Sequence, residues 1–151
     1  MRCVGLVWAS APAPIVFLTV VTAGRRPVLA SALVERILRE TWLHSPPVAG
    51  WSVGRYVVMP DHVHLFARAS TCARPMASWV KAWKSITSRD IAASLAMRAP
   101  IRQRDYFDRF LRSADVYSQK WDYVRDNPVR AGLFSGSSEW PWQGCLTDLS
   151  F

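Results

Sequence analysis

The alternation of hydrophobic and polar positions divides the chain into segments with strand or helix character. Residues 15–21 form an apolar, β-branched run bounded by Gly24, which is typical of a buried strand. Residues 51–58 are rich in Val, Trp and Tyr, and the break at 59–61 separates them from residues 62–69. The two segments therefore predict an antiparallel hairpin.

Three further segments have apolar residues at helical spacing. Ser31 can cap a helix that ends before Pro46-Pro47, and residues 75–97 predict a second, longer helix. Ser113 can cap a third helix that ends near Asp126, because Pro128 disfavours helical geometry at the residue before it. The second helix is expected to direct Trp79, Trp83, Ile86 and Ile91 to the core, and Lys81, Lys84 and Arg89 outward.

The order of these elements predicts the fold class. Residues 106–112 are ambiguous by pattern and are interpreted as a short strand, and the Trp-rich tail is expected to be irregular. The resulting order, strand-helix-strand-strand-helix-strand-helix, indicates an α+β sandwich of the ferredoxin-like kind, an antiparallel sheet with helices packed on one face. With 151 residues and no linker-like tract, residues 1–151 are expected to form one domain.

Charge adds an expected partner to this picture. The net charge is +8, and 16 of the 19 basic residues are arginine, which grips phosphate with two donors. A polyanion, most simply nucleic acid, is favoured, although composition alone leaves an anionic membrane surface open. Candidate phosphate contacts are Lys81, Lys84, Arg89, Arg125 and Arg130, for which a solvated face is the alternative.

The termini and the cysteines bear on the compartment. Arg2 and the apolar stretch after it superficially resemble a secretory signal, but Pro12 and Pro14 interrupt that stretch, so a strand is favoured and no membrane partner is expected. The three cysteines are widely separated and contain no CxxC pair. They indicate neither a disulfide framework nor a zinc knuckle, and a reducing, cytoplasmic compartment fits best.

The first candidate for chemistry is the sequence His62-Val63-His64. Residues i and i+2 of a strand project from the same face, so both imidazoles point one way. Two neutral imidazoles at this spacing can chelate one divalent metal ion. A pair of ordinary surface or core histidines is the alternative, because the motif is short.

The second candidate is the pair Tyr123 and Asn127. The two residues are four apart and are therefore expected on one face of the third helix or of its last turn. A tyrosine can attack phosphate and form a covalent phosphotyrosine, and an amide oxygen can complete a metal site. A half-buried aromatic residue and a helix-end cap are the alternatives.

Four segments, in order, resemble a known family. Residues 56–66 (YVVMPDHVHLF) are similar to the His-hydrophobic-His strand of the single-strand, or HUH, tyrosine transposases. Residues 104–112 (RDYFDRFLR) and 121–133 (WDYVRDNPVRAGL) resemble the branch known as REP-associated tyrosine transposases. The tail motif WPW at 140–142 and the turn TAGRRP at 22–27 also resemble that branch, so the similarity covers about residues 15–144.

The resemblance implies a role for each candidate residue. His62 and His64 would be ligands of Mg²⁺ or Mn²⁺, Tyr123 would be the nucleophile, and Asn127 would supply the third ligand. The implied activity is metal-dependent cleavage and transfer of single-stranded DNA at hairpin-forming repeats through a 5′-phosphotyrosine intermediate. The proton acceptor for the tyrosine is open, with Asp61 and Asp122 as candidates beside their roles as turn and helix-surface residues.

Other functions and assembly states remain open from the sequence. A non-catalytic DNA-hairpin binder would share the fold, and a metal-dependent phosphoesterase would use water in place of tyrosine. A structural interaction protein is a further alternative and predicts no salt-dependent DNA affinity. The chain could act as a monomer or a homodimer, so Tyr123 could serve its own metal site or that of a partner.

Overall fold

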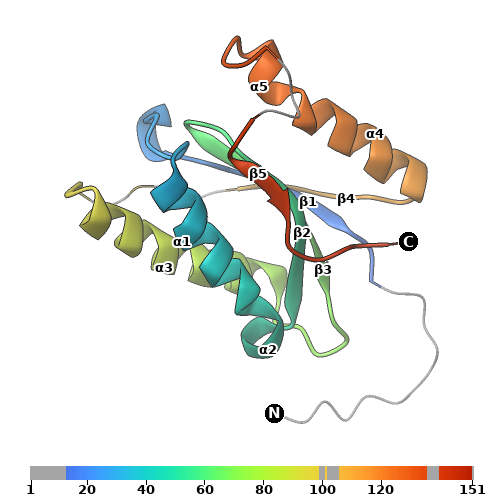
Figure 1. Cartoon of the computed structure of the whole chain (residues 1–151). Helices are drawn as coiled ribbons and strands as arrows, with labels where there is room; N and C mark the ends of the chain where they lie inside the picture. The colour runs from blue at the N-terminus through green and yellow to red at the C-terminus, as the bar shows by residue number, and fades with distance from the viewer. Residues whose placement is uncertain (1–12, 99–100, 102–105, 136–139, 151) are drawn as a thin grey trace.

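The computed structural model describes residues 13–98, 101, 106–135 and 140–150 (Figure 1). Five strands form one sheet in the order β4-β1-β3-β2-β5, and every neighbouring pair is antiparallel. The strands are β1 (Val16–Val21), β2 (Trp51–Val58), β3 (His62–Ala69), β4 (Phe107–Phe110) and β5 (Gln143–Cys145). The predicted hairpin is confirmed with the same bounds, and the order of the first four strands is that expected of a ferredoxin-like sandwich.

The helices follow from local capping. They are the 3-10 turn η1 (Ala23–Arg25), α1 (Ala32–Leu43), α2 (Ser45–Ala49), α3 (Met76–Ser94), α4 (Ala114–Arg125) and α5 (Asn127–Arg130). The side chains of Ser31 and Ser113 accept hydrogen bonds of 3.2 Å from the third backbone N–H that follows each of them, as predicted. Pro46-Pro47 do not simply end a helix but stand in the first turn of α2, where a missing N–H costs nothing.

Two hydrophobic clusters lie on opposite faces of the sheet. Alternate residues of β1 and β3, such as Leu18 and Leu65, pack against α1 and α3, whereas Phe17 and Phe66 face α4 through Val124. The predicted fold class is confirmed, and its one-face packing holds for α1 and α3. The helix α4 crosses the other face, as Figure 1 shows. The two faces of the sheet are therefore covered by different helices.

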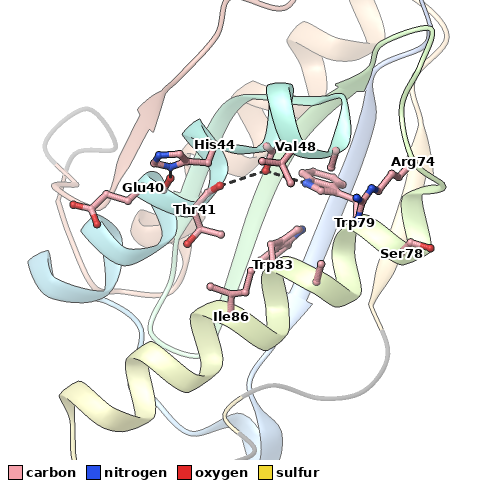
Figure 2. Close-up of a pocket in the computed structure, with 12 residues that line it drawn as sticks. Glu40, Thr41, His44, Val48, Arg74, Ser78, Trp79, Trp83 and Ile86 are labelled. Carbon is pink, nitrogen blue, oxygen red and sulfur yellow. Dashed lines mark hydrogen bonds between the residues drawn. The ribbon is translucent and has the colours of Figure 1, made fainter. Parts of the chain in front are cut away.

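The orientation of α3 differs from the prediction at two positions. Lys84 was expected outward but is 8% exposed, and Ile86 was expected in the core but is 41% exposed. The buried stripe of this helix runs through Val80, Lys84, Thr87 and Ile91, with Trp79 and Trp83 beside it. Ile86 lies beyond that stripe, at the rim of a cavity of about 360 Å³ between α3 and the α1–α2 corner (Figure 2).

Two sequence expectations about the tail and the cysteines are corrected. The tail was expected to be irregular, but β5 pairs with the edge of β2, where Tyr56 stands opposite Gly144. Cys72 is disulfide-bonded, contrary to the expectation of unpaired cysteines, whereas Cys145 is free and exposed.

Within the described residues, no helix combines the length and the apolar character needed to cross a bilayer.

Candidate active site

The histidine pair occupies the central part of the sheet, on the α4 face. In β3, Val63 is directed to the α1–α3 core while His62 and His64 project to the opposite side, as the strand period predicts. Their ring centroids are 4.7 Å apart and the rings are inclined by 76°. β3 is the central strand of the sheet and is paired with β1 on one side and β2 on the other, so the histidine pair lies on a strand that is hydrogen-bonded along both edges.

A second contact orients each imidazole ring. The Nδ1–H of His62 donates to Oδ1 of Asp61 at 2.7 Å, and Nδ1 of His64 lies 2.9 Å from the hydroxyl of Thr19. Asp61 also forms a 3.4 Å ion pair with Arg25. Burial alone would raise the pKa of Asp61, but the hydrogen bond from His62 and the charges of His62 and Arg25 lower it. Asp61 therefore stands as a carboxylate that orients a histidine.

The surroundings of His64 favour its neutral form. Its ring stacks on Phe17 with centroids 5.2 Å apart. Burial, with smaller contributions from the positive charges of His62, Lys120 and Arg130, lowers the pKa of His64 to about 3. An imidazole that stays neutral near pH 7 keeps a ring nitrogen able to bind a metal ion.

Asn127 approaches the histidine pair from the junction of two helices. The helix α4 ends at Arg125, and Asn127 begins α5 after Asp126. The side-chain Nδ2 of Asn127 donates to Nε2 of His62 at 3.2 Å. The amide thus lies beside the imidazole. It was expected in the last turn of the preceding helix but lies at the start of α5.

The donor set fits a divalent metal ion. Two ligand atoms at about 2.1 Å from one ion, at right angles, lie about 3 Å apart, which is close to the Asn127–His62 separation. A half-turn of the Asn127 amide would present its oxygen to the ion in place of the nitrogen, and the Arg130 hydrogen bond to that oxygen would then be broken. Both histidines have Nδ1 engaged by another side chain, as metal-binding histidines usually do. In the described part of the chain, no three His, Cys, Asp or Glu side chains gather as a metal cluster. The Asn127 amide is the further side-chain donor beside His62.

Tyr123 is an accessible side chain held between cations. It is 60% exposed, and the Arg130 guanidinium lies 3.8 Å from its ring centroid. The Lys120 ammonium lies 5.5 Å from the same centroid. Arg130 also donates to Oδ1 of Asn127 at 3.4 Å. A continuous series of contacts therefore joins Tyr123, Arg130, Asn127 and His62.

The other predicted contact residues lie elsewhere. Arg125 points to acidic neighbours, with Asp122 at 3.6 Å and Asp126 at 4.0 Å. Lys81 and Arg89 are exposed on α3, which packs on the opposite face of the sheet from the histidines. Lys84 is buried, and its ammonium lies 5.7 Å from the centroid of the Tyr106 ring. Of the five candidate phosphate contacts, Arg130 is the one that reaches the site.

Two residues of the site were not predicted. Lys120 lies over the Phe17 ring at 4.6 Å, and its position one helical turn before Tyr123 was the signal available in the sequence. Thr19 carried no such signal, because its contact with His64 depends on the pairing of β1 with β3. The cavity between α1, α2 and α3 (Figure 2) is lined by none of the predicted site residues.

Comparisons with known proteins show a family and a shared fold. The family model described as "Transposase IS200 like" matches residues 15–125. A solved structure of a REP-associated tyrosine transposase bound to a REP hairpin is 20% identical, with a TM-score of 0.70, covering 95% of this chain and 82% of that one. A candidate transposase from Deinococcus radiodurans is 20% identical, with a TM-score of 0.57, covering 83% and 96%. No curated protein sequence matches the chain. At this identity the two structures show a shared fold.

Proposed function

The chain belongs to the IS200-like transposase family, and from that premise we propose that it cleaves and transfers single-stranded DNA with Tyr123 as the nucleophile. It is an enzyme, a transposase. The observation that carries the proposed chemistry is the continuous series of contacts from Tyr123 through Arg130 and Asn127 to His62. This series joins an accessible phenol to the proposed metal ligands of the same chain.

The residues support a transfer in which the phosphodiester bond of DNA is exchanged for a phosphotyrosine bond, so the strand can be rejoined without a nucleotide cofactor. The Tyr123 hydroxyl attacks phosphorus and loses its proton, while the bond from phosphorus to the 3′-oxygen breaks and that oxygen leaves as a hydroxyl. The products are a 5′-phosphotyrosine and a free 3′-hydroxyl, which can reverse the step at the same or another strand end. Arg130, beside both Tyr123 and Asn127, is placed to hold the phosphate.

His62, His64 and Asn127 would hold a divalent ion. When bound, Mg²⁺ or Mn²⁺ supplies Lewis-acid polarisation of a non-bridging phosphate oxygen. Imidazole donors suit Mn²⁺ better than Mg²⁺, so manganese is the better ion for a first assay. Asp61 and Thr19 would keep the two rings oriented during the reaction.

The proposed substrate is a DNA hairpin with single-stranded flanks. The net charge of +8 suits a polyanion, and the REP-associated transposase that shares this fold is bound to a REP hairpin. Action on cellular DNA in the cytoplasm belongs to the same proposal. Both the monomer and the homodimer are compatible with it, although the contacts within one chain favour a Tyr123 that serves its own histidine pair.

Covalent capture tests the proposal. We expect labelled hairpin DNA and Mn²⁺ to give a protein–DNA adduct on a denaturing gel, and we expect Tyr123→Phe or EDTA to abolish it. Tyr117→Phe is the matched control, because this second tyrosine of α4 is partly buried against Phe66. Cleavage that survives Tyr123→Phe would establish a water-using phosphoesterase, and binding without any adduct across several repeats would establish a hairpin-binding protein.

A further inference from the structure

The edge strand β4 exposes an aromatic side chain that the proposed reaction does not use. Phe107 is 68% exposed, although Phe is a residue type that is usually buried. All four residues of β4 are exposed, and β4 pairs with β1 at the end of the sheet order. An exposed aromatic ring at a sheet edge is available to a partner.

The strand register places Phe107 in line with the histidine pair. Thr19 of β1 stands opposite His64 on one side and opposite Phe107 on the other. Directly paired residues of neighbouring strands project from the same face. Because the Thr19 hydroxyl contacts His64, Phe107 shares the α4 face with the histidines and lies two strands away, beyond Thr19.

Cations accompany this aromatic residue. Arg109 is two residues after Phe107 on the same face, opposite Phe17, whose ring lies under the Lys120 ammonium. Burial lowers the pKa of Lys120, and the nearby charge of Arg109 lowers it further, which agrees with two cations on one face. Lys120 in turn lies beside Tyr123. Proteins bind single-stranded nucleic acid with this combination: aromatic rings stack on the bases, and basic side chains beside them contact the phosphates.

We propose that Phe107 stacks on a nucleobase of the single-stranded DNA that passes the histidine pair, while Arg109 and Lys120 hold the adjoining phosphates. The inference rests on the proposed function for the path of the strand. It adds a base-binding position on β4 to the residues that act on the phosphate. The stacking is expected to tolerate any base, because every base presents a π-face.

The test compares two phenylalanines of one strand. Phe110 is 51% exposed but stands opposite Val16, so it projects from the other face of the sheet and serves as the matched control. Binding is measured in the Tyr123→Phe background by fluorescence anisotropy. The probes are a synthetic hairpin with oligothymidine flanks and the same hairpin with abasic flanks. We expect Phe107→Ala to weaken binding of the base-bearing probe about 5- to 100-fold and to leave the abasic probe unchanged.

The remaining variants separate stacking from charge and from misfolding. Phe107→Trp should retain the affinity, and Phe110→Ala should not alter it. Arg109→Gln should lower the slope of log K against log salt by about one, whereas Phe107→Ala should leave that slope unchanged. Equal loss in Phe107→Ala and Phe110→Ala would overturn the inference, and so would a Tyr123→Phe protein with Phe107 intact that binds both probes alike. The adduct assay with Tyr123 tests the proposed function and does not depend on these binding measurements. A protein that forms no adduct would therefore contradict the proposed function, whereas unaltered binding by Phe107→Ala would contradict the stacking inference alone.

Discussion

At the scale of single residues, His64 shows how the sheet prepares a side chain for metal binding. Its ring lies between Phe17 and the His62 ring, and Thr19 engages Nδ1. Burial and three neighbouring cations oppose protonation. The same surroundings that keep the imidazole neutral therefore also connect the stability of the protein to pH.

The metal-free protein is expected to lose stability in acid through His64. The pKa of His64 is lowered to about 3 in the folded state, below its ordinary value of 6.5. Between these values the unfolded chain binds the proton and the folded chain does not, so stability is full above pH 6.5 and decreases as pH falls toward 3. The loss attributable to His64 is about 3 kcal/mol at pH 4, measurable by urea unfolding at several pH values in EDTA.

Two histidine variants isolate this contribution. His64→Gln should flatten the pH dependence between pH 6.5 and 4, because the titrating group is absent. His44→Gln is the matched control, since it removes an exposed imidazole at the end of α1, away from the histidine pair. A His64→Gln protein with the pH dependence of the parent would contradict the assignment.

At the scale of elements, the short strand β5 depends on a glycine. Gly144 pairs with Tyr56 of β2, and a Cβ at Gly144 would lie 2.7 Å from the Tyr56 hydroxyl oxygen. That hydroxyl cannot easily move, because it donates to Glu35 at 2.7 Å and accepts from Arg39 at 3.3 Å. The edge of the sheet is thus fixed to α1 through a buried tyrosine.

Gly144→Ala is expected to reduce the free energy of unfolding by about 1–3 kcal/mol, the usual cost of overpacking. Chemical denaturation measures the loss, and a double-mutant cycle with Tyr56→Phe tests its cause. Without the hydroxyl, the penalty of Gly144→Ala should decrease, because the nearest clashing atom is gone. Additive penalties would show that the clash with Tyr56 is not responsible.

Much of the element pattern was predictable because it depends on local rules. The bounds of β2 and β3 follow from strand periodicity, and the starts of α1 and α4 follow from serine caps. The strand β5 was missed because three residues, Gln143–Cys145, carry no periodicity and are ordered by pairing with β2. Lys84 was misplaced because its charge directed the prediction outward, whereas its long side chain lies within the buried stripe of α3, with the ammonium 5.7 Å from the centroid of the Tyr106 ring.

The candidate site was predictable in part for a similar reason. The shared face of His62 and His64 depends on the strand period alone, and the resemblance supplied Tyr123 and Asn127. The contact of Asn127 with His62 spans 65 residues and requires the tertiary fold. Phe107 and Arg109 could not be related to the site from sequence, because their place beside His64 depends on the register of three strands.

At the scale of the whole molecule, the described structure separates two faces. The α4 face carries the histidine pair, Tyr123 and the Phe107 edge, whereas the α1–α3 face carries the cavity shown in Figure 2. Arg130 and Asn127 join Tyr123 to the histidine pair of the same chain. This arrangement predicts how the enzyme behaves when inactive copies are mixed.

Tyr123→Phe and His64→Ala are each expected to lower the yield of covalent adduct at least about 100-fold, since one lacks the nucleophile and the other a ligand. A mixture of the two variants should remain at that background, because each chain must supply both parts of its own site. The measurement is adduct formation with labelled hairpin at increasing ratios of one variant to the other. Recovery in the mixture would show that tyrosine and histidines come from different chains.

The two parts of the site are anchored to the fold very differently. The histidines belong to a central strand whose neighbours are buried, whereas α4 buries one side chain, Val124, and holds Tyr123 toward solvent. Segments with few buried contacts open by local unfolding at a small free-energy cost, while central strands open only with the whole domain. We therefore expect assembly of the site to be an equilibrium separate from global unfolding. A DNA strand that contacts both parts would shift that equilibrium, so substrate binding and the ordering of the nucleophile become one event.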